Sequence, residues 1–237
     1  MMHPAKKTIL LKLTGEVFLS PTTKTLDNSL IKNIATHIKQ LSTEYYFGIV
    51  IGGGNFFRGN THGKALELST SVGHQIGMLA TVMNGLIIKD LLEQADIPAT
   101  IFCALPSSEI GTPISQQAIK QAIKQGTCII FTGGTGNPYF TTDTTSIVRG
   151  LQIQAQAVWK ASNVDGVYDA DPRLNNHANL IKKISFQDAL NNNLRIMDAT
   201  AFTLAKENNL PIRVFNIFQP DALLKAAEST DFGSIVN

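Results

Sequence analysis

The chain has 237 residues, a length between one and two average domains, so a single sizeable hydrophobic core is within reach. Hydrophobic residues make up 43% and charged residues 16%, with 20 Lys and Arg against 18 Asp and Glu spread along the sequence. This balance argues against a nucleic-acid partner and against a membrane surface. The early apolar segment "TILLKLTGEVF" is interrupted by Lys12, so it is too short for a signal sequence or a spanning helix. We therefore expect a cytoplasmic protein.

Short apolar runs alternate with longer segments of helical periodicity. In chain order the pattern predicts strands at 7–13, 46–51, 99–104, 127–132, 156–162 and 211–216. It predicts helices at 27–40, 72–95, 113–125, 142–155, 198–208 and 220–228, with Asp27 as the first N-cap and a capping box "SFQD" at 185–188. Continuously apolar strands are typical of sheets buried on both faces. We predict an α/β fold in one domain, 1–237, with a mainly parallel sheet covered on both sides.

The two cysteines of the sequence, Cys103 and Cys128, each lie within an apolar run. Neither has the neighbouring residues of a catalytic or metal-binding cysteine. We expect both to be buried, reduced thiols.

Four predicted strand-to-helix junctions carry unusual residues. They are "LKLTGE" (11–16), "IGGGNFFRG" (51–59), "TGGTGNPYFTTD" (132–143) and "KASNVDGVYDADP" (160–172). In open parallel sheets ligands bind beyond the carboxyl ends of the strands. We therefore expect all four junctions to gather at one edge of the sheet.

The triple glycine raises the question of what approaches the backbone so closely. Glycine lets several N–H groups point at one ligand, and a following helix adds the partial positive charge of its N-terminus. Arg58 can bind phosphate oxygens in a bidentate manner, and Lys12 beside Gly15 adds a second cation. The pattern predicts a phosphate cradle made of Gly53, Gly54 and Arg58. A tight turn without a ligand is the alternative.

Several common catalytic motifs are missing from the sequence. It contains no G-x-x-x-x-G-K-[ST], no G-x-G-x-x-G after the first strand, no H-R-D set and no G-x-S-x-G, and its histidines lack metal-ligand spacing. This disfavours P-loop, dinucleotide, protein-kinase, hydrolase and zinc chemistry.

Seven motifs nonetheless resemble those of the bacterial uridylate kinases, in the amino-acid kinase family, nearly end to end. They are "ILLKLTGE", "VIGGGNFFRG", "GMLATVMNG", "GTGNPYFTTD", "VDGVYDADP", "MDATAF" and "LPIRVFN". The resemblance implies a three-layer αβα sandwich, a homohexamer, ATP with Mg²⁺ as phosphoryl donor and UMP as acceptor in pyrimidine nucleotide biosynthesis. It also implies allosteric control, with GTP as activator and UTP as inhibitor.

The resemblance assigns the donor contacts residue by residue, with Lys12 and Arg58 as the catalytic cations. The expected ATP-binding residues are Lys12, Leu13, Thr14, Gly15, Gly54, Arg58, Ser162, Asn163, Tyr168 and Asp171. A solvent-reaching lysine, a half-buried surface tyrosine and a turn aspartate before Pro172 are the alternatives for Lys12, Tyr168 and Asp171.

The acceptor contacts are expected from the second glycine turn and the loop after the fourth strand. The UMP-binding set is Gly53, Thr135, Gly136, Asn137, Pro138, Tyr139, Phe140, Thr141 and Thr142. The Asn137 amide and the loop hydroxyls would distinguish uracil from cytosine. The alternative is a plain loop in which Thr142 or Asp143 caps the next helix.

No residue is assigned to a metal, because Mg²⁺ commonly arrives on phosphates and keeps several waters. Asp143, Asp165 and Asp198 are acidic candidates near the site, with capping or turn roles equally open. The acceptor phosphate, with a second pKa of about 6, is already a dianionic nucleophile at neutral pH, so no general base is required.

Two positions depart from the pattern of the resembled family. His74 stands where those proteins usually carry an acidic residue that contacts the ribose, and an imidazole lacks the two acceptor oxygens of a carboxylate. A core or surface histidine is the alternative. Asn163 stands where some carry a lysine, which leaves Lys12, Lys160 and Arg58 to neutralise charge. Lys160 is the weaker candidate, because a strand lysine can snorkel.

Two alternative functions stay open on the sequence. One is a related kinase with another acidic acceptor, because the donor half of such sites is shared more widely. The other is a nucleotide-sensing regulator without turnover.

Overall fold

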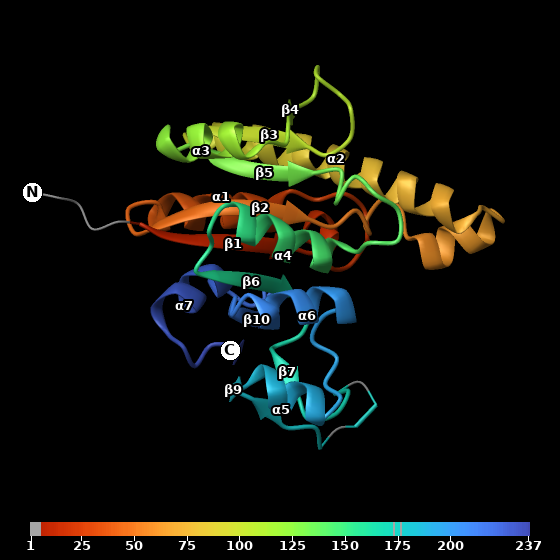
Figure 1. Cartoon of the computed structure of the whole chain (residues 1–237), viewed down its shortest axis with the longest axis vertical. Coiled ribbons are helices and arrows are strands. Elements are labelled where there is room, and N and C mark those ends of the chain that lie inside the picture. Colours follow the sequence, from red (N-terminus) through yellow and green to blue (C-terminus); the bar gives the residue numbers. More distant parts are fainter. Residues whose placement is uncertain (1–5, 173, 176) are drawn as a thin grey trace, which may run out of the picture.

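The computed structural model describes residues 6–172, 174–175 and 177–237, and within them a nine-stranded sheet runs through the molecule (Figure 1). The order of its strands is β4-β3-β5-β2-β1-β6-β10-β11-β9. Their bounds are β1 Lys7–Leu13, β2 Tyr45–Ile51, β3 Ala99–Cys103, β4 Thr112–Pro113, β5 Cys128–Thr132, β6 Ala157–Ser162, β9 Lys183–Ile184, β10 Ile212–Asn216 and β11 Ser234–Val236. Neighbouring strands pair in parallel except β10 with β11, so the predicted mainly parallel sheet is confirmed.

Helices cover both faces of this sheet. One face carries α1 (Ser29–Leu41), α2 (Thr70–Gln94) and α7 (Ala222–Glu228). The other carries α3 (Gln116–Lys124), α4 (Thr142–Gln152), α5 (Phe186–Asn191) and α6 (Ala199–Glu207). Each face has its own cluster of buried apolar side chains, so the three-layer arrangement expected from the sequence is confirmed.

Successive residues of β1 alternate between these two clusters. Leu11 and Leu13 are buried with α1 and α2, whereas Leu10 is buried on the side of α4. Lys12 therefore points toward α4, and this direction decides its contacts in the site.

The six predicted strands are all present, but the shortest strands were not predicted. A separate antiparallel hairpin joins β7 (Val167–Tyr168) to β8 (Leu180–Ile181), and β4 and β9 also span two residues each. Two residues cannot display a period of two, so such strands leave no pattern in the sequence.

The predicted helix ends are wrong by a few residues. Asp27 is not the N-cap of α1, since that helix begins at Ser29 after Asn28, although Asp27 Oδ1 accepts the N–H of Ser29 at 2.7 Å. α2 begins at Thr70 rather than 72, because the Ser69 hydroxyl caps it. α3 likewise begins at Gln116 after Ser115, rather than at 113.

Two polar signals did locate helix starts. The predicted capping box opens α5, where Ser185 Oγ accepts the N–H of Asp188 at 3.0 Å. Asp198 caps α6 in the same way, by accepting the N–H of Ala201 at 2.9 Å. α4, α6 and α7 end at Gln152, Glu207 and Glu228, within three residues of the predicted ends.

α2 is long and apolar enough to cross a membrane, judged by length and composition alone. Half of its most apolar window, 50%, is buried inside the protein. Ile88, Leu91 and Leu92 pack against the sheet, so α2 serves as a core helix. Its first turns run past the carboxyl ends of the strands, where the candidate site lies (Figure 1).

The cysteine prediction is confirmed. Cys103 on β3 and Cys128 on β5 are both free and buried. Burial raises the pKa of the Cys128 thiol to about 12, so this group is an unreactive thiol at neutral pH.

Candidate functional site

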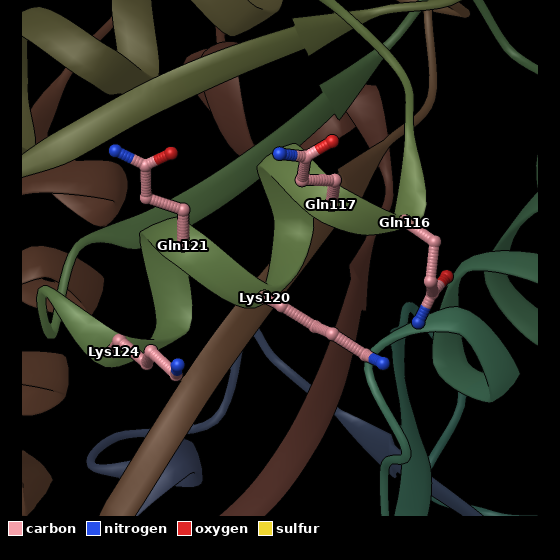
Figure 2. Close-up of a pocket in the computed structure, with 5 residues that line it drawn as sticks. All are labelled: Gln116, Gln117, Lys120, Gln121 and Lys124. Carbon is pink, nitrogen blue, oxygen red and sulfur yellow. The ribbon is translucent and has the colours of Figure 1, made fainter.

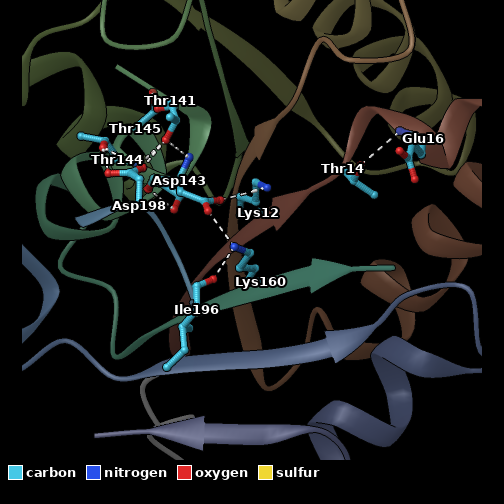
Figure 3. A network of polar contacts seen from close by, with 11 residues as sticks. Lys12, Thr14, Glu16, Thr141, Asp143, Thr144, Thr145, Lys160, Ile196 and Asp198 are labelled. Atoms are coloured by element: carbon cyan, nitrogen blue, oxygen red, sulfur yellow. Dashed lines mark hydrogen bonds and ion pairs between the residues drawn. The ribbon is translucent and has the colours of Figure 1, made fainter. Parts of the chain in front are cut away.

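Two lysines and one aspartate form a buried cluster at the ends of β1 and β6 (Figure 3). Lys12 and Lys160 are directly opposite one another in the register of these strands. Asp143, in the first turn of α4, lies between them, with Oδ1 3.0 Å from Lys12 Nζ and Oδ2 2.6 Å from Lys160 Nζ. The side chains of Lys12, Lys160 and Asp143 are 12%, 14% and 16% exposed, respectively. The three residues therefore form a largely dry ionic cluster rather than a surface ion pair.

The charges of this cluster depend on one another. Burial alone raises the pKa of Asp143, but the two ammonium groups outweigh it and hold the pKa below its ordinary value. Burial lowers the pKa of Lys160, and its attraction to Asp143 offsets part of that effect. Lys160 Nζ also donates to the Ile196 carbonyl oxygen at 2.6 Å. The idea that Lys160 merely snorkels to solvent is therefore wrong.

Lys12 has fewer partners than Lys160. Within the described part of the chain, its ammonium group has one partner, Asp143, in an ion pair with Nζ 3.0 Å from Oδ1. Its N–H donors are not otherwise engaged, so Lys12 is the better placed of the two lysines to bind an incoming anion.

The start of α4 is joined to the start of α6. Thr141, not Thr142 or Asp143, is the N-cap of α4, and its hydroxyl accepts the N–H groups of Asp143 and Thr144. The same hydroxyl donates to Asp198, which caps α6. Thr141 therefore positions the loop, and its hydroxyl is already engaged before any ligand arrives.

Two glycines of the triple-glycine turn, Gly53 and Gly54, differ in whether the space around them requires a glycine. A Cβ on Gly53 would lie 2.7 Å from Ala80 Cβ and 2.8 Å from the Gly77 carbonyl oxygen, so the packing of α2 requires this glycine. A Cβ on Gly54 would meet nothing closer than Arg58 Nε at 3.5 Å. The packing of α2 therefore explains the glycine at 53, whereas no packing contact explains the glycine at 54.

The turn is also fixed from α2. Asn84 is fully buried, donates to the Gly52 carbonyl oxygen at 2.7 Å and exchanges hydrogen bonds with Asn55. Neither Gly53 nor Gly54 donates its N–H to another described residue. Both N–H groups are therefore free to bind an anion.

The two glycines should differ in their response to one added methyl group. We expect Gly53→Ala to lower the melting temperature by about 2–12 °C, because overpacking costs about 1–3 kcal/mol and each kcal/mol shifts a domain of this size by about 2–4 °C. Gly54→Ala should stay within about 2 °C of the unchanged protein. Calorimetric melting of both variants measures this difference, and equal melting temperatures would contradict the packing argument.

Arg58 forms a second polar cluster, on the other side of the glycine turn. Its guanidinium pairs with Glu16, and its Nε donates to the Gly54 carbonyl oxygen at 3.0 Å. Asn163 Nδ2 donates to the second oxygen of Glu16 at 3.2 Å. Glu16, which was not singled out in the sequence, thus occupies cationic and amide groups that could bind phosphate.

Two cavities meet at this cluster. The larger, of about 950 Å³, is lined by Glu16, Asn163 and other residues around the N-terminus of α1. The smaller, of about 540 Å³, lies between the glycine turn, the first turns of α2 and the loop before α4. Gly54 and Arg58 line both cavities, so they form a shared wall.

The expected ATP-binding residues are only partly brought together. Gly54, Arg58 and Asn163 line the larger cavity, whereas the residues from Lys12 to Gly15 do not. Ser162, Tyr168 and Asp171 do not line it either, and they lie in the segment from β6 to β7 and the turn beyond it. The Tyr168 hydroxyl is 3.4 Å from Asp165 Oδ2, and the Asp171 carbonyl oxygen accepts two N–H groups of its turn.

Asp165 holds loops together. Its Oδ1 accepts from Asn216 at 2.9 Å and from Gln219 at 2.7 Å, which joins the loop after β6 to the loop after β10. This carboxylate is therefore a structural tie.

The residues after β1 contribute mainly backbone. The Leu13 side chain is fully buried in the core, and its carbonyl oxygen accepts the Gly52 N–H at 3.0 Å. Thr14 caps the short 3-10 helix Gly15–Phe18. A Cβ on Gly15 would lie 2.6 Å from the Gly52 carbonyl oxygen, so packing against the second turn requires this glycine.

The predicted acceptor segment is a loop held at its start by glycines and an arginine. Gly133, Gly134 and Gly136 have positive φ, which suits glycine. Arg149 is buried and donates to the Gly134 carbonyl oxygen at 3.2 Å. Gly134 and the residues Phe140, Thr141 and Thr142 line the smaller cavity; Thr135 to Tyr139 do not. Thr135 Oγ1 instead bonds within the loop, to Asn137.

A third hollow, of about 560 Å³, lies on α3 and does not resemble a binding site. Figure 2 shows its glutamine and lysine side chains projecting from one helix in diverging directions. Because these groups do not converge on a common point, they would not hold a ligand together.

Comparison with known proteins agrees with this architecture. The sequence profile described as the amino acid kinase family matches residues 7–216. The chain belongs to the amino acid kinase family. A uridylate kinase of Pseudoalteromonas atlantica is 42% identical over 233 residues, which cover 98% of this chain and 94% of that protein. One of Haemophilus influenzae is 40% identical over 237 residues, 100% of both chains.

Solved structures of UMP kinases show the same fold. The UMP kinase from Ureaplasma parvum superposes with a TM-score of 0.93 at 34% identity, covering 99% of this chain and 100% of that one. The UMP kinase from Bacillus anthracis gives a TM-score of 0.91 at 29% identity, covering 98% and 96%. The resemblance noted in the seven sequence motifs is thereby confirmed.

Proposed function

We propose that the chain transfers the terminal phosphoryl group of ATP to UMP, giving ADP and UDP, in pyrimidine nucleotide biosynthesis. Uridylate kinases about as long as this chain, at 40% to 42% identity, support the substrate pair. The observation that carries the proposal is the wall shared by two cavities, Gly54 and Arg58. Two nucleotides that meet at one cationic wall can bring their phosphates end to end.

The larger cavity would take ATP and the smaller UMP. Asn163, Arg58 and the Gly54 N–H would face the donor phosphates, and Ser162, Tyr168 and Asp171 would be reached only by its nucleoside. Gly53, with the loop from Thr135 to Thr142, would surround the acceptor.

Phosphoryl transfer mainly requires that the two nucleotides be positioned in line and that the charge of their phosphates be neutralised. A UMP phosphate is a dianion at neutral pH, with a second pKa of about 6, so it can attack in line without a general base. The carboxylates of Asp143 and Glu16 are each engaged by cationic or amide groups, which agrees with a reaction that needs no base. Lys12, whose one ion-pair partner among the described residues is Asp143, would stabilise the charge on the transferred group.

Mg²⁺ would accompany ATP. Among the residues that the structure describes, no group of three or more His, Cys, Asp or Glu side chains could hold a metal ion. The donor set therefore fits an ion carried mainly by phosphate oxygens and water, with Glu16 beside them. Bound there, Mg²⁺ would neutralise charge on the phosphates.

A coupled assay of ADP release tests the proposal. The full chain is supplied with ATP, Mg²⁺ and, in turn, UMP, CMP and acetylglutamate. Turnover that depends on UMP and is much slower with the other two supports the proposal. Turnover with acetylglutamate alone would indicate a kinase with another acidic acceptor. UMP binding without ADP release would indicate a nucleotide sensor.

Replacing the shared cationic side chain should slow the reaction strongly. We expect Arg58→Ala to lower UMP-dependent turnover about a hundredfold, in line with about 2–4 kcal/mol for one preorganised charge contact. Steady-state kinetics measure this change. Arg195→Ala is the matched control, because this exposed arginine lines neither cavity. An unchanged rate in Arg58→Ala would remove Arg58 from the site.

Assembly and regulation belong to the same proposal. Leu79, Met83 and Leu86 are 55%, 45% and 44% exposed and lie on one face of α2, which suits a contact between subunits of a homohexamer. We further propose that residues 1–237 form a single domain and that the protein is cytoplasmic. We also propose that GTP activates the enzyme and that UTP inhibits it. Sedimentation and titration of both nucleotides into the assay test these statements.

A further inference from the structure

We propose that His74 is a positioning residue that holds the acceptor loop through the backbone N–H of Tyr139. His74 Nδ1 accepts this N–H at 2.7 Å, and the two rings lie 5.3 Å apart. The inference rests on the proposed function, because it assigns the loop to binding of the acceptor nucleotide. It adds to that function the atom, His74 Nδ1, that maintains the conformation of the acceptor loop.

Tyr139 needs such a contact. Its φ of 72° lies in the left-handed region, which is unfavourable for a residue with a side chain. Its side chain is 69% exposed, so burial in the core does not hold it in place. The bond from His74 is therefore well placed to stabilise this conformation.

The loop has attachments on either side of this point. Near its start, the Gly134 carbonyl oxygen accepts from Arg149, and near its end Thr141 donates to Asp198. Pro138 to Phe140 lie between these attachments, and Tyr139 is bonded there to His74. Without that bond, the middle of the loop would be free to move while its ends stayed in place.

His74 is itself on a firm support. It lies in the second turn of α2, a helix that the Ser69 hydroxyl caps and whose later turns are buried against the sheet. It also lines the smaller cavity. An Nδ1 that accepts carries no proton, so the proton of the neutral ring is on Nε2. The imidazole thus fixes the loop through Nδ1.

A pair of substitutions separates this role from simple filling of space. In His74→Asn, Oδ1 is attached to Cγ as Nδ1 is in histidine, so the acceptor is retained. In His74→Gln the acceptor is one bond further out, so it is moved away from Tyr139. We expect His74→Gln to raise the KM for UMP about tenfold, in line with the loss of one hydrogen bond that orders a binding loop. His74→Asn should restore that KM to within about twofold of the unchanged protein. The KM for ATP should change little in either variant.

Chymotrypsin gives a second measurement that does not depend on catalysis. It cleaves after exposed aromatic residues, and Tyr139 and Phe140 are exposed. We expect cleavage there, located by mass spectrometry of the peptides, to be about tenfold faster in His74→Gln than in His74→Asn or the unchanged protein. Melting temperatures of all three proteins verify that they are folded.

The outcomes distinguish this inference from the proposed function. Equal KM values for UMP and equal cleavage in the two variants would overturn the role of Nδ1, even while UMP turnover supported the kinase assignment. Absence of UMP turnover in the unchanged protein would refute the proposed function, and the link to acceptor binding would fall with it. Faster cleavage confined to His74→Gln would still establish the loop contact itself.

Discussion

Lys12→Gln should lower UMP-dependent ADP release about a thousandfold, the largest loss of activity expected from one substitution in this chain. Its ammonium group lies near the end of β1, is paired only with Asp143 among the described residues, and has N–H donors available for the transferred phosphoryl group. Removing a preorganised charge contact in a dry site costs about 3–4 kcal/mol of transition-state stabilisation. The loss should therefore appear mostly in kcat, which steady-state kinetics at saturating nucleotide measure.

The same substitution should not unfold the protein. Without Lys12, Asp143 and Lys160 remain as a neutral pair at 2.6 Å, so no buried charge loses its partner. Lys7→Gln is the matched control, because Lys7 is an exposed lysine at the other end of the same strand. Unchanged turnover in Lys12→Gln, with Lys7→Gln as reference, would show that Lys12 is structural.

Asp143→Asn should produce the largest loss of stability. The carboxylate is the common partner of two lysines that stand opposite one another in the sheet. Without its charge, two largely buried ammonium groups repel each other with no counter-charge between them. Breaking a buried ion pair costs about 3–5 kcal/mol, which for this chain length corresponds to a fall of about 6–20 °C in the melting temperature.

Asp96→Asn is the matched control for that result. Lys39 and Asp96 form an ion pair at 2.7 Å, a distance similar to those around Asp143, but both side chains are exposed. An exposed pair contributes little to stability, because water screens it. Calorimetry should therefore show a melting temperature near that of the unchanged protein for Asp96→Asn. A fall of similar size in both variants would contradict the argument from burial.

The pH dependence of the Asp143 effect has a definite sign. Its pKa in the folded protein lies below the ordinary value of 3.8, so the carboxylate stabilises the fold most fully above that value. This contribution is lost as the pH falls through the folded pKa. Urea unfolding of both proteins should therefore show a difference in free energy of unfolding that is constant near neutral pH and shrinks below about pH 4.

The fold was largely predictable, because its central strands are buried on both faces and read as unbroken apolar runs. The expectation that four junctions gather at one edge is also confirmed, since β5, β2, β1 and β6 are consecutive and parallel in the sheet. Boundaries were less predictable where a serine outside the periodic segment, such as Ser69 or Ser115, sets the start of a helix.

The composition of the site was predictable, but its internal contacts were not. Lys12 and Lys160 each interrupt an apolar strand, which is a signal in itself, yet their pairing depends on a strand register that no local pattern contains. The role of Gly53 depends on α2, more than twenty residues further along the chain. Glu16 lies in the motif "LKLTGE", but its pairing with Arg58 joins residues 42 positions apart, which no local pattern contains.

The charge balance at the ends of β1 and β6 has a consequence for the stability of the whole protein. Two ammonium groups share one paired carboxylate there, and the charge of Asp198 acts on Lys160 from further away, so positive charge is in excess beside Lys12. An anion that binds beside Lys12 removes this excess, and any ligand that binds only the folded state raises its stability. The empty protein is then its least heat-resistant form, and its resistance to heat rises with the concentration of phosphorylated compounds around it.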